Sequence, residues 1–249
     1  MTASTAEAAS GDVVLITGAG RGLGLALAEE WLARPSTRTV LLGVRDPRTT
    51  TVRELRARHG DRAVPVPMDD TARLRRPGDL ASLLGEPARI DVLVNCAGAN
   101  QDPALPGEAS KGPAPLLDPD AVRAVHDVNV LGPLTVVQAC LPYLRRSPDA
   151  VVVNIGSARG SLRACRDARS YAYAMSKAAL HMLTRKLACE LPDMTVLVWS
   201  PGWVATDMGG VGAPATPREA ARSLLALLAP EQRPASGQFV DRDGARIPW

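Results

Sequence analysis

A short apolar run that leads directly into a glycine-rich turn is the feature that most constrains how this chain folds. Residues 13–16 read Val-Val-Leu-Ile, and the turn that follows, residues 17–24, reads Thr-Gly-Ala-Gly-Arg-Gly-Leu-Gly. Residues 23–33 then carry apolar side chains at helical spacing. The order strand, glycine turn, helix predicts the first unit of a sheet in which strands and helices alternate.

Six further apolar runs alternate with segments of helical period. The predicted strands are residues 39–42, 63–66, 90–94, 150–155, 195–199 and 238–240. Continuous apolar strands are buried on both faces, which is typical of parallel sheets, and right-handed crossovers then place helices on both sides. The sequence therefore predicts an α/β fold, a Rossmann-type doubly wound parallel sheet of about seven strands flanked by helices.

Two long helices are predicted beside the sheet. One covers about residues 119–146, with Asp118 as its N-cap, and Pro133 and Pro142 should bend or fray it. The other covers about residues 171–190.

We expect a single domain over residues 1–249, because a chain of 249 residues supports one sizeable core rather than two. Residues 1–11 are predicted to be a disordered tail and residues 101–119 a surface loop.

Charge and cysteine content exclude several classes of function. The net charge of +3 comes from 29 basic and 26 acidic residues that are scattered, so no nucleic-acid partner is predicted. The 4 cysteines are far apart, which predicts reduced thiols and no metal site. No signal peptide is evident, and no apolar run approaches the roughly 18 to 20 residues that span a bilayer. We expect a cytoplasmic protein without a membrane partner.

The glycine turn is suited to binding a dinucleotide. Glycines let the backbone approach a pyrophosphate, and the helix N-terminus offers N–H donors to it. The common G-x-G-x-x-G spacing is not met from Gly18, because Leu23 occupies the last position, so a plain turn without a ligand is the alternative. The cofactor-binding residues predicted here are Gly18, Gly20, Arg21, Gly22, Leu23 and Gly24.

The end of the second strand distinguishes NAD from NADP. An acidic residue about 20 positions after the glycines would bind the ribose 2′-hydroxyl of NAD. This chain has Val44, Arg45 and Asp46 there, and Arg45 can pair with a phosphate, with Arg21 close enough to assist. NADP(H) is therefore the predicted cofactor. In the alternative, Asp46 binds the ribose and Arg45 is only solvated.

Tyr173 and Lys177 are four residues apart in a predicted helix and share one face. A nearby ammonium would stabilise tyrosinate, and lowering the phenol pKa by about 2 to 3 units requires roughly 3 to 4 kcal/mol. Such a pair alone is usually an ordinary helix face. Ser157 follows the fifth strand at the edge where open α/β sheets bind ligands, so its hydroxyl could meet the same substrate.

Asn129 is a polar residue in an apolar helical stretch and needs a hydrogen-bond partner. A water-mediated relay to Lys177 would supply one, and a helix irregularity beside Pro133 is the alternative. The fourth strand closes with small residues, Asn95-Cys96-Ala97-Gly98, which suits close approach of a cofactor.

These motifs together resemble the short-chain dehydrogenase/reductase family. The glycine pattern, residues 95–98, Asn129, Ser157 and the Y-x-x-x-K at residues 173–177 occur in that family's order and intervals over essentially the whole chain. Residues 201–210 and 243–249 resemble a narrower group, the sniffer-like carbonyl reductases and C-factor signalling proteins, whose members mostly prefer NADPH.

The resemblance implies a role for each residue in the reduction of a carbonyl. Tyr173 would be the general acid and Ser157 would orient the carbonyl. Lys177 would lower the tyrosine pKa and bind the nicotinamide ribose, and Asn129 would hold a proton-relay water. Hydride would pass from nicotinamide C4 to the carbonyl carbon of a small-molecule substrate.

The resemblance also implies further cofactor contacts and an assembly. Asp69 would contact adenine, and Val204 and Thr206 the nicotinamide carboxamide. The remaining contacts would come from Asn95, Ala97, Gly98, Pro201 and Gly202. A homodimer or homotetramer packed through the two long helices is implied as well.

Two positions and one interval depart from the family pattern. Cys96 replaces the second Asn of N-N-A-G, and Gly156 replaces a frequent Ser, which leaves Ser157 as the only hydroxyl there. The interval from Ser157 to Tyr173 is longer than is common, although it is like that of the narrower group. Arg159, Arg163, Arg166 and Arg169 in this interval would attract an anionic substrate or would simply be solvated.

Three functions remain open at this stage. The first is an NADPH-dependent ketone or aldehyde reductase, such as one of secondary metabolism. The second keeps the fold and cofactor but reduces an imine or catalyses a redox-neutral rearrangement. The third is a non-catalytic NADP(H)-binding signalling protein, which would have no need of the complete Tyr, Lys, Ser and Asn set.

Overall fold

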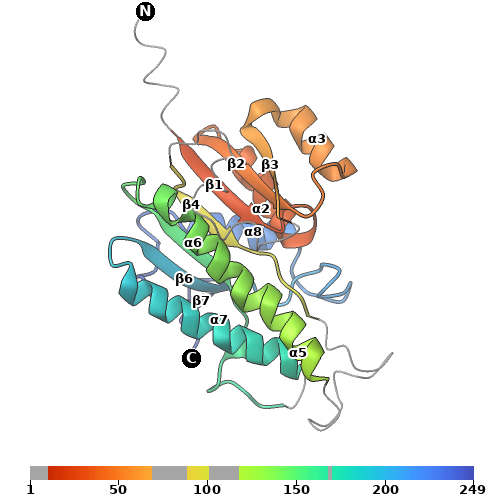
Figure 1. Ribbon diagram of the computed structural model, residues 1–249, viewed down its shortest axis with the longest axis vertical. Helices are drawn as coiled ribbons and strands as arrows, with labels where there is room; N and C mark the ends of the chain where they lie inside the picture. The colour runs from red at the N-terminus through yellow and green to blue at the C-terminus, as the bar shows by residue number, and fades with distance from the viewer. Residues whose placement is uncertain (1–10, 69–88, 101–117, 168–169) are drawn as a thin grey trace, which may run out of the picture.

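The computed structural model describes residues 11–68, 89–100, 118–167 and 170–249. They form one seven-stranded sheet in the order β3-β2-β1-β4-β5-β6-β7, and every neighbouring pair is parallel (Figure 1). The strands are β1 (Asp12–Thr17), β2 (Thr37–Val44), β3 (Ala63–Pro67), β4 (Val92–Asn95), β5 (Val151–Ile155), β6 (Thr195–Ser200) and β7 (Phe239–Asp241). This confirms the predicted parallel sheet. The predicted tail, except Gly11, and nearly all of the predicted loop lie outside the described residues.

The strand order reverses between β1 and β4. The chain runs outward from β1 to β3, returns to pair β4 with the other side of β1, and continues to β7. Open α/β sheets bind ligands at the carboxyl ends of the strands beside such a reversal. The glycine turn leaves β1 at this edge, so the topology places it beside the end of β4.

Helices cover both faces of the sheet because alternate strand residues point to opposite sides. Val14 and Ile16 of β1 belong to one apolar cluster, and Val13 and Leu15 to the other. The first cluster includes residues of α2 (Gly22–Leu32), α3 (Thr50–His59) and α8 (Pro217–Leu227). The second includes residues of α6 (Gly132–Leu144) and α7 (Tyr171–Glu190). Figure 1 shows α6 and α7 in front of the sheet and α8 behind it.

The predicted helix over 119–146 is interrupted rather than regular. α5 (Pro119–His126) begins after Asp118, whose carboxylate accepts the N–H of Asp120 at 3.0 Å, so the predicted N-cap is confirmed. A π-helical turn, Asp127–Leu131, then leads into α6, and Pro133 lies in the first turn of α6. Proline cannot donate to the carbonyl four residues earlier, which accounts for the widened turn at this point. Pro142 lies inside α6 without ending it.

The run Pro119–Leu144, 26 residues long, contains an 18-residue window of mean hydropathy 1.2 and so has the length and apolarity of a membrane-spanning helix. This corrects the expectation that no apolar run comes near that length. Core helices of soluble proteins meet the same two criteria, and here the buried side chains of α6, such as Val136 and Cys140, pack against the sheet. The packing explains the apolarity without a membrane.

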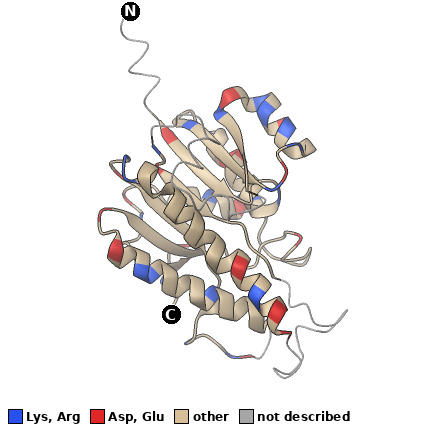
Figure 2. Cartoon of the chain, in the orientation of Figure 1, with Lys and Arg blue, Asp and Glu red and all other residues tan. Residues whose placement is uncertain are grey.

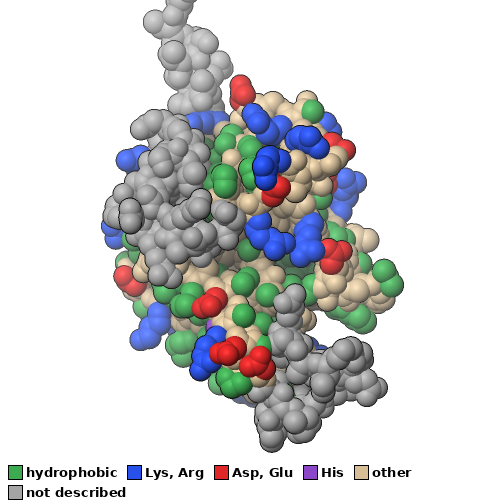
Figure 3. Space-filling view, turned by 45° about the vertical axis from the view of Figure 1, so that its right-hand side comes forward, with side chains coloured by type: hydrophobic (Ala, Val, Ile, Leu, Met, Phe, Trp, Pro, Cys, Tyr) green, Lys and Arg blue, Asp and Glu red, His purple; other side chains and the backbone are tan. Residues whose placement is uncertain are grey.

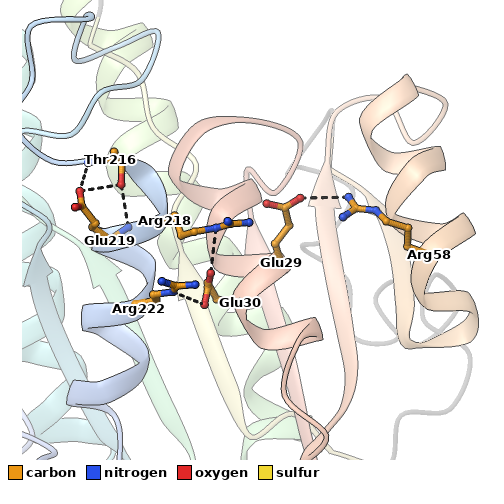
Figure 4. Close-up of polar contacts among 7 residues, drawn as sticks. All are labelled: Glu29, Glu30, Arg58, Thr216, Arg218, Glu219 and Arg222. Carbon is orange, nitrogen blue, oxygen red and sulfur yellow. Dashed lines mark hydrogen bonds and ion pairs between the residues drawn. The ribbon is translucent and has the colours of Figure 1, made fainter.

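Most charged side chains lie on the helices and in the loops, and the central strands β4, β5 and β6 carry none (Figure 2). On α2, Glu30 pairs with Arg222 at 3.1 Å and Arg218 at 3.3 Å of α8, and Glu29 pairs with Arg58 of α3 at 3.2 Å (Figure 4). Exposed pairs of this kind contribute about 0 to 1 kcal/mol each. The position of α8 therefore depends mainly on apolar packing and on its N-terminal cap.

That cap is a reciprocal one. The Thr216 hydroxyl accepts the N–H of Glu219 at 3.2 Å, and the Glu219 carboxylate accepts the N–H of Thr216 at 2.8 Å (Figure 4). We predict that Thr216→Ala lowers the free energy of unfolding by about 1 kcal/mol in urea titrations. Thr49→Ala is the matched control, because Thr49 precedes α3 without a side-chain capping bond. Equal losses in the two variants would contradict the role of the cap.

Candidate active site

The glycine turn and the end of β4 approach each other too closely for side chains. Gly18 has a φ of +71°, and a Cβ there would lie 2.9 Å from the Ala97 Cα. A Cβ on Gly24 would lie 2.3 Å from the Gly18 carbonyl oxygen. The Thr17 hydroxyl accepts the backbone N–H groups of both Cys96 and Ala97 at 3.0 Å. The two strand ends therefore form one rigid backbone cradle.

The start of α2 suits an anion. α2 begins at Gly22, its first turn has no acidic residue, and Arg21 makes no side-chain capping bond to it. The first N–H groups of such a helix have no intrahelical partner and carry a partial positive charge. Leu23 instead packs on the apolar cluster below α2, so its contribution to the cradle is its backbone.

The residues at the end of β2 bear on the choice between a phosphate at Arg45 and a ribose at Asp46. Asp46 accepts hydrogen bonds from Arg48, from its backbone N at 2.9 Å and its Nε at 3.0 Å, and these bonds lower the pKa of Asp46. Arg45 is exposed. Val44 lies beside the glycine turn, since a Cβ on Gly20 would be 3.6 Å from its Cγ1. The carboxylate is thus engaged locally, which favours a phosphate at Arg45 over a ribose at Asp46.

Residues 201–207 return the chain to the glycine turn. Arg21 pairs with Asp207 at 2.8 Å, with both side chains exposed. The methyl group of Thr206 would lie 3.3 Å from a Cβ on Gly22. Val204 is buried, and its backbone bridges to Ala215. Pro201 is buried and Gly202 exposed directly after β6. The predicted nicotinamide segment thus lies beside the predicted pyrophosphate site.

Basic side chains are numerous on this part of the surface. Arg21, Arg45 and Arg48 are all exposed. The space-filling view shows Lys and Arg side chains gathered on the face that it brings forward, with few acidic ones among them (Figure 3). Such a surface favours an anionic ligand.

Ser157 and Tyr173 meet beyond the end of β5. Ser157 is the N-cap of a short 3₁₀ turn, Ala158–Gly160, and its hydroxyl accepts the N–H of Arg159 at 3.2 Å. Tyr173 lies in the first turn of α7. Burial raises the pKa of Tyr173, whereas its hydrogen bond to the Ser157 side chain and the charge of Arg159 act in the opposite direction.

Lys177 lies one turn further along α7. Its Nζ is 5.5 Å from the centre of the Tyr173 ring and donates to the Ile155 carbonyl at 2.8 Å. Burial lowers the pKa of Lys177 to about 8, against the opposing effect of Cys96. We expected the pKa of Tyr173 to be lowered. In the protein without a cofactor it is raised instead, because the effect of burial is larger than that of the neighbouring charges. The roles of both side chains stay predictions.

Asn129 lies in the π-helical turn and is buried. Its Oδ1 accepts the N–H of Ala99 at 2.8 Å, and its Nδ2 donates to the Ala99 carbonyl at 2.8 Å and to the Ser176 hydroxyl at 2.9 Å. The amide thus has protein partners, and the expected water-mediated relay to Lys177 stays a prediction. The backbone carbonyl of Asn129 differs from its amide. In a regular α-helix it would accept the backbone N–H of residue 133, but this residue is a proline and has no N–H.

Gly98 lies between the glycine cradle and the side chains of Asn129 and Lys177. A Cβ there would lie 3.4 Å from Asn129 Oδ1 and 3.9 Å from Lys177 Nζ. Ala97 and Gly98 are exposed at this edge. Asn95 is not, because its amide is buried in the sheet and donates to Asn154 Oδ1 at 2.8 Å. Of the remaining predicted contacts, Asp69 and Arg169 lie outside the described residues.

Sequence reasoning missed Ser176 and His181, which are buried on the same helix as Lys177. Ser176 accepts from Asn129, and His181 accepts from the backbone N of Ser157 at 3.4 Å. The sequence did contain a signal for them. One polar residue is adjacent to Lys177 and the other lies one turn further along the helix, and a polar group on a buried helix face needs a hydrogen-bond partner.

A family model described as short chain dehydrogenase matches residues 12–214. The chain belongs to the short-chain dehydrogenase family. It is therefore an oxidoreductase of this type, and the resemblance predicted from the motifs is confirmed.

Three known proteins place this short-chain dehydrogenase more closely. It is 37% identical over 163 residues to C-signal of Myxococcus xanthus, which covers 64% of this chain and 93% of C-signal. It matches the crystal structure of NADPH-bound carbonyl reductase from chicken fatty liver with a TM-score of 0.82 and 28% identity, over 96% of this chain and 100% of that one. It matches carbonyl reductase Sniffer of D. melanogaster with a TM-score of 0.81 and 25% identity, over the same shares.

The buried lysine of this short-chain dehydrogenase has a consequence for stability. Burial lowers the pKa of Lys177 from 10.5 to about 8, so between these values the unfolded chain holds a proton that the folded protein releases. We predict that the contribution of Lys177 to the free energy of unfolding rises with pH across this window by about 2 to 3 kcal/mol. The buried thiols of Cys96 and Cys140 contribute in the opposite direction, because burial raises their pKa values. Urea titrations from about pH 8 to 10 measure it.

The difference in the free energy of unfolding between the wild type and Lys177→Met should change by this amount across the window, whereas the difference for Lys186→Met, at an exposed position of the same helix, should stay constant. Parallel pH profiles of the wild type and Lys177→Met would contradict the contribution of Lys177.

Proposed function

We propose that this short-chain dehydrogenase reduces a ketone or an aldehyde with NADPH. The observation that carries the proposal is the hydrogen-bonded pair of Ser157 and Tyr173, with the ammonium of Lys177 beside it, at the sheet edge that also holds the glycine cradle. Two hydroxyls that converge on one point can both donate to a carbonyl oxygen. No part of the glycine cradle needs that pair, so binding of a dinucleotide alone does not explain it.

The residues present fit NADP(H). The cradle at Gly18 and Gly24 has room for backbone only, and the uncapped start of α2 offers N–H donors to a pyrophosphate. Arg45 would bind the 2′-phosphate, which the local pairing of Asp46 favours. The carbonyl reductase from chicken fatty liver, which is similar over nearly the whole chain, is bound to NADPH. When bound, the cofactor supplies a hydride.

The nicotinamide end of the cofactor would lie between the two halves of the site. Val204 and Thr206 would contact the carboxamide, since Thr206 packs beside Gly22 of the cradle. Gly98 separates the cradle from Asn129 and Lys177 without a side chain of its own, which leaves room for the ribose. Lys177 Nζ, now bound to the Ile155 carbonyl, would donate to the ribose hydroxyls.

Ser157, Tyr173 and Lys177 would have different roles in the reduction. The hydroxyls of Ser157 and Tyr173 donate to the substrate oxygen and hold the carbonyl polarised. As a hydride adds to the carbonyl carbon, the phenolic proton of Tyr173 passes to the oxygen, so that C=O becomes CH–OH and tyrosinate remains. Charges of Lys177 and Arg159 stabilise that tyrosinate against the cost of its burial.

The tyrosinate must regain its proton from solvent. Lys177 is the nearest ammonium, and we place the continuing path at the backbone carbonyl of Asn129, which Pro133 cannot bind. The side chain of Asn129 would hold that carbonyl in place through Ala99 and Ser176. In this arrangement Asn129 would hold the proton-relay water at its backbone carbonyl.

We also propose that the protein is a cytoplasmic homodimer or homotetramer. The helices α5, α6 and α7 and the π-helical turn between α5 and α6 form one layer. Four large apolar side chains of this layer are exposed: Val128 and Leu131 of the π-helical turn, and Met175 and Met182 of α7. Apolar side chains that gather on one layer favour association with a second copy.

The first test replaces the phenol. We predict that Tyr173→Phe lowers kcat/KM for carbonyl reduction by at least about 100-fold, because a general acid contributes that much or more. The Kd for NADPH, from quenching of its fluorescence, should stay within about threefold. Consumption of NADPH with a panel of ketones, quinones and aldehydes measures turnover, and Tyr143→Phe on α6 is the control.

Unchanged turnover in Tyr173→Phe would remove this residue from the acid role. Wild-type protein that binds NADPH and reduces nothing in the panel would instead favour imine reduction, redox-neutral chemistry or a signalling role.

The second test concerns the cofactor. We predict that Arg45→Asp lowers the ratio of kcat/KM with NADPH to that with NADH by at least about tenfold, because a carboxylate repels the 2′-phosphate and can accept the 2′-hydroxyl of NAD. Arg53→Asp, an exposed arginine of α3, should leave the ratio unchanged. An unchanged ratio in Arg45→Asp would mean that the phosphate binds elsewhere.

A further inference from the structure

His181 is a buried imidazole directly behind Ser157. It is 3% exposed and lies one turn beyond Lys177 on α7. The backbone N of Ser157 donates to its Nε2 at 3.4 Å. A ring nitrogen that accepts must be unprotonated, so the proton of the neutral ring lies on Nδ1. Nδ1 is buried and has no hydrogen-bond partner among the described residues.

Two glycines let the backbone of the Ser157 turn lie against this ring. A Cβ on Gly156 would lie 2.2 Å from Val198 Cγ1 and 2.8 Å from His181 Nε2, and a Cβ on Gly160 would lie 2.7 Å from His181 Cε1. Real Cβ atoms do not approach other atoms so closely. The departure at Gly156, where the family often has Ser, is therefore explained by the space that Val198 and the imidazole occupy together.

An aromatic cluster holds the other side of the ring. The His181 ring lies 4.3 Å from Phe239 of β7 and 5.8 Å from Trp249, centre to centre. Trp249 is fixed in turn, because its carbonyl accepts the N–H of Arg163 at 3.0 Å. The Ser161 hydroxyl donates to the Pro248 carbonyl. Residues 245–249 thus join the imidazole to the segment that follows Ser157.

The surroundings keep the imidazole neutral. Burial, and then the ammonium of Lys177, lower the pKa of His181 to about 4, against the opposing effect of the Gly160 backbone. A neutral ring remains a hydrogen-bond acceptor throughout the neutral pH range. The bond to Ser157 therefore does not depend on pH where the enzyme would work.

We infer that His181 is a positioning residue for the reaction proposed above. Its Nε2 accepts the Ser157 N–H and so sets where the Ser157 hydroxyl stands relative to Tyr173, while Phe239 and Trp249 fix the ring. The inference rests on the proposed function, in which Ser157 donates to the substrate oxygen. His181 itself touches neither substrate nor cofactor in this scheme.

Two substitutions separate the acceptor from the volume of the side chain. His181→Leu removes the acceptor, and we expect kcat to fall about tenfold or more, which is the worth of one hydrogen bond. His181→Gln keeps an amide oxygen near the place of Nε2 and should retain kcat within about threefold. The Kd for NADPH should be unchanged in both. Equal losses in the two variants would overturn the inference.

A double-mutant cycle tests whether the effect passes through Ser157. In a Ser157→Ala background, His181→Leu should cause no further loss of kcat, because the hydroxyl that it positions is already absent. A structural role would lower kcat by the same factor in both backgrounds. That additive result would overturn the inference.

The tautomer gives a readout that needs no turnover. The protein has 3 histidines, so the His181 signals in a ¹⁵N NMR spectrum of ¹⁵N-histidine-labelled protein are assigned by their loss in His181→Gln. At neutral pH these signals should show a protonated Nδ1 and an unprotonated Nε2. A proton on Nε2 would overturn the inference whatever the activity. A wild-type enzyme that reduces no carbonyl but shows this tautomer would overturn the proposed function alone and support the hydrogen bond to Ser157.

Discussion

The approach of two strand ends at the point where the sheet order reverses is the constraint on which the site depends. The Thr17 hydroxyl binds the N–H groups of Cys96 and Ala97, and Gly18 lies so close to Ala97 that no side chain fits between them. This contact fixes the path of the glycine turn and the direction in which α2 starts. It also brings Gly98 beside Asn129 and Lys177. The contact between the two strand ends therefore joins the glycine cradle to the side chains that we propose to be reactive.

Most of the fold could be predicted from the sequence because its elements depend on local chemistry. All seven apolar runs became strands, since each is buried on both faces, and the helix predicted over 171–190 has those bounds in α7. The π-helical turn at Asp127–Leu131 could not be predicted. Pro133 signalled an irregularity, but its form depends on hydrogen bonds from Asn129 to Ala99 and Ser176, which only the folded chain brings together.

The site was predicted less completely than the fold, and the reason is burial. Motif spacing predicted a shared site for Ser157, Tyr173 and Lys177, and these side chains lie near one another in the structure, while their roles stay predictions. It did not indicate that burial would raise the tyrosine pKa, or that the side chain of Asn95 would turn into the sheet towards Asn154. Such outcomes depend on neighbours distant in sequence, so residue type and interval alone do not determine them.

The fit between Gly156 and His181 also limits how this enzyme can diverge. A side chain at position 156 would meet Val198 Cγ1 at 2.2 Å and the imidazole at 2.8 Å, so a hydroxymethyl group is tolerated there only after both neighbours have made room. Position 156 is therefore epistatic with positions 181 and 198, and the order of the substitutions matters. Lineages that retain both the valine and the histidine remain committed to glycine before the serine, and a homologue with serine at 156 is expected to carry more compact residues at 181 and 198.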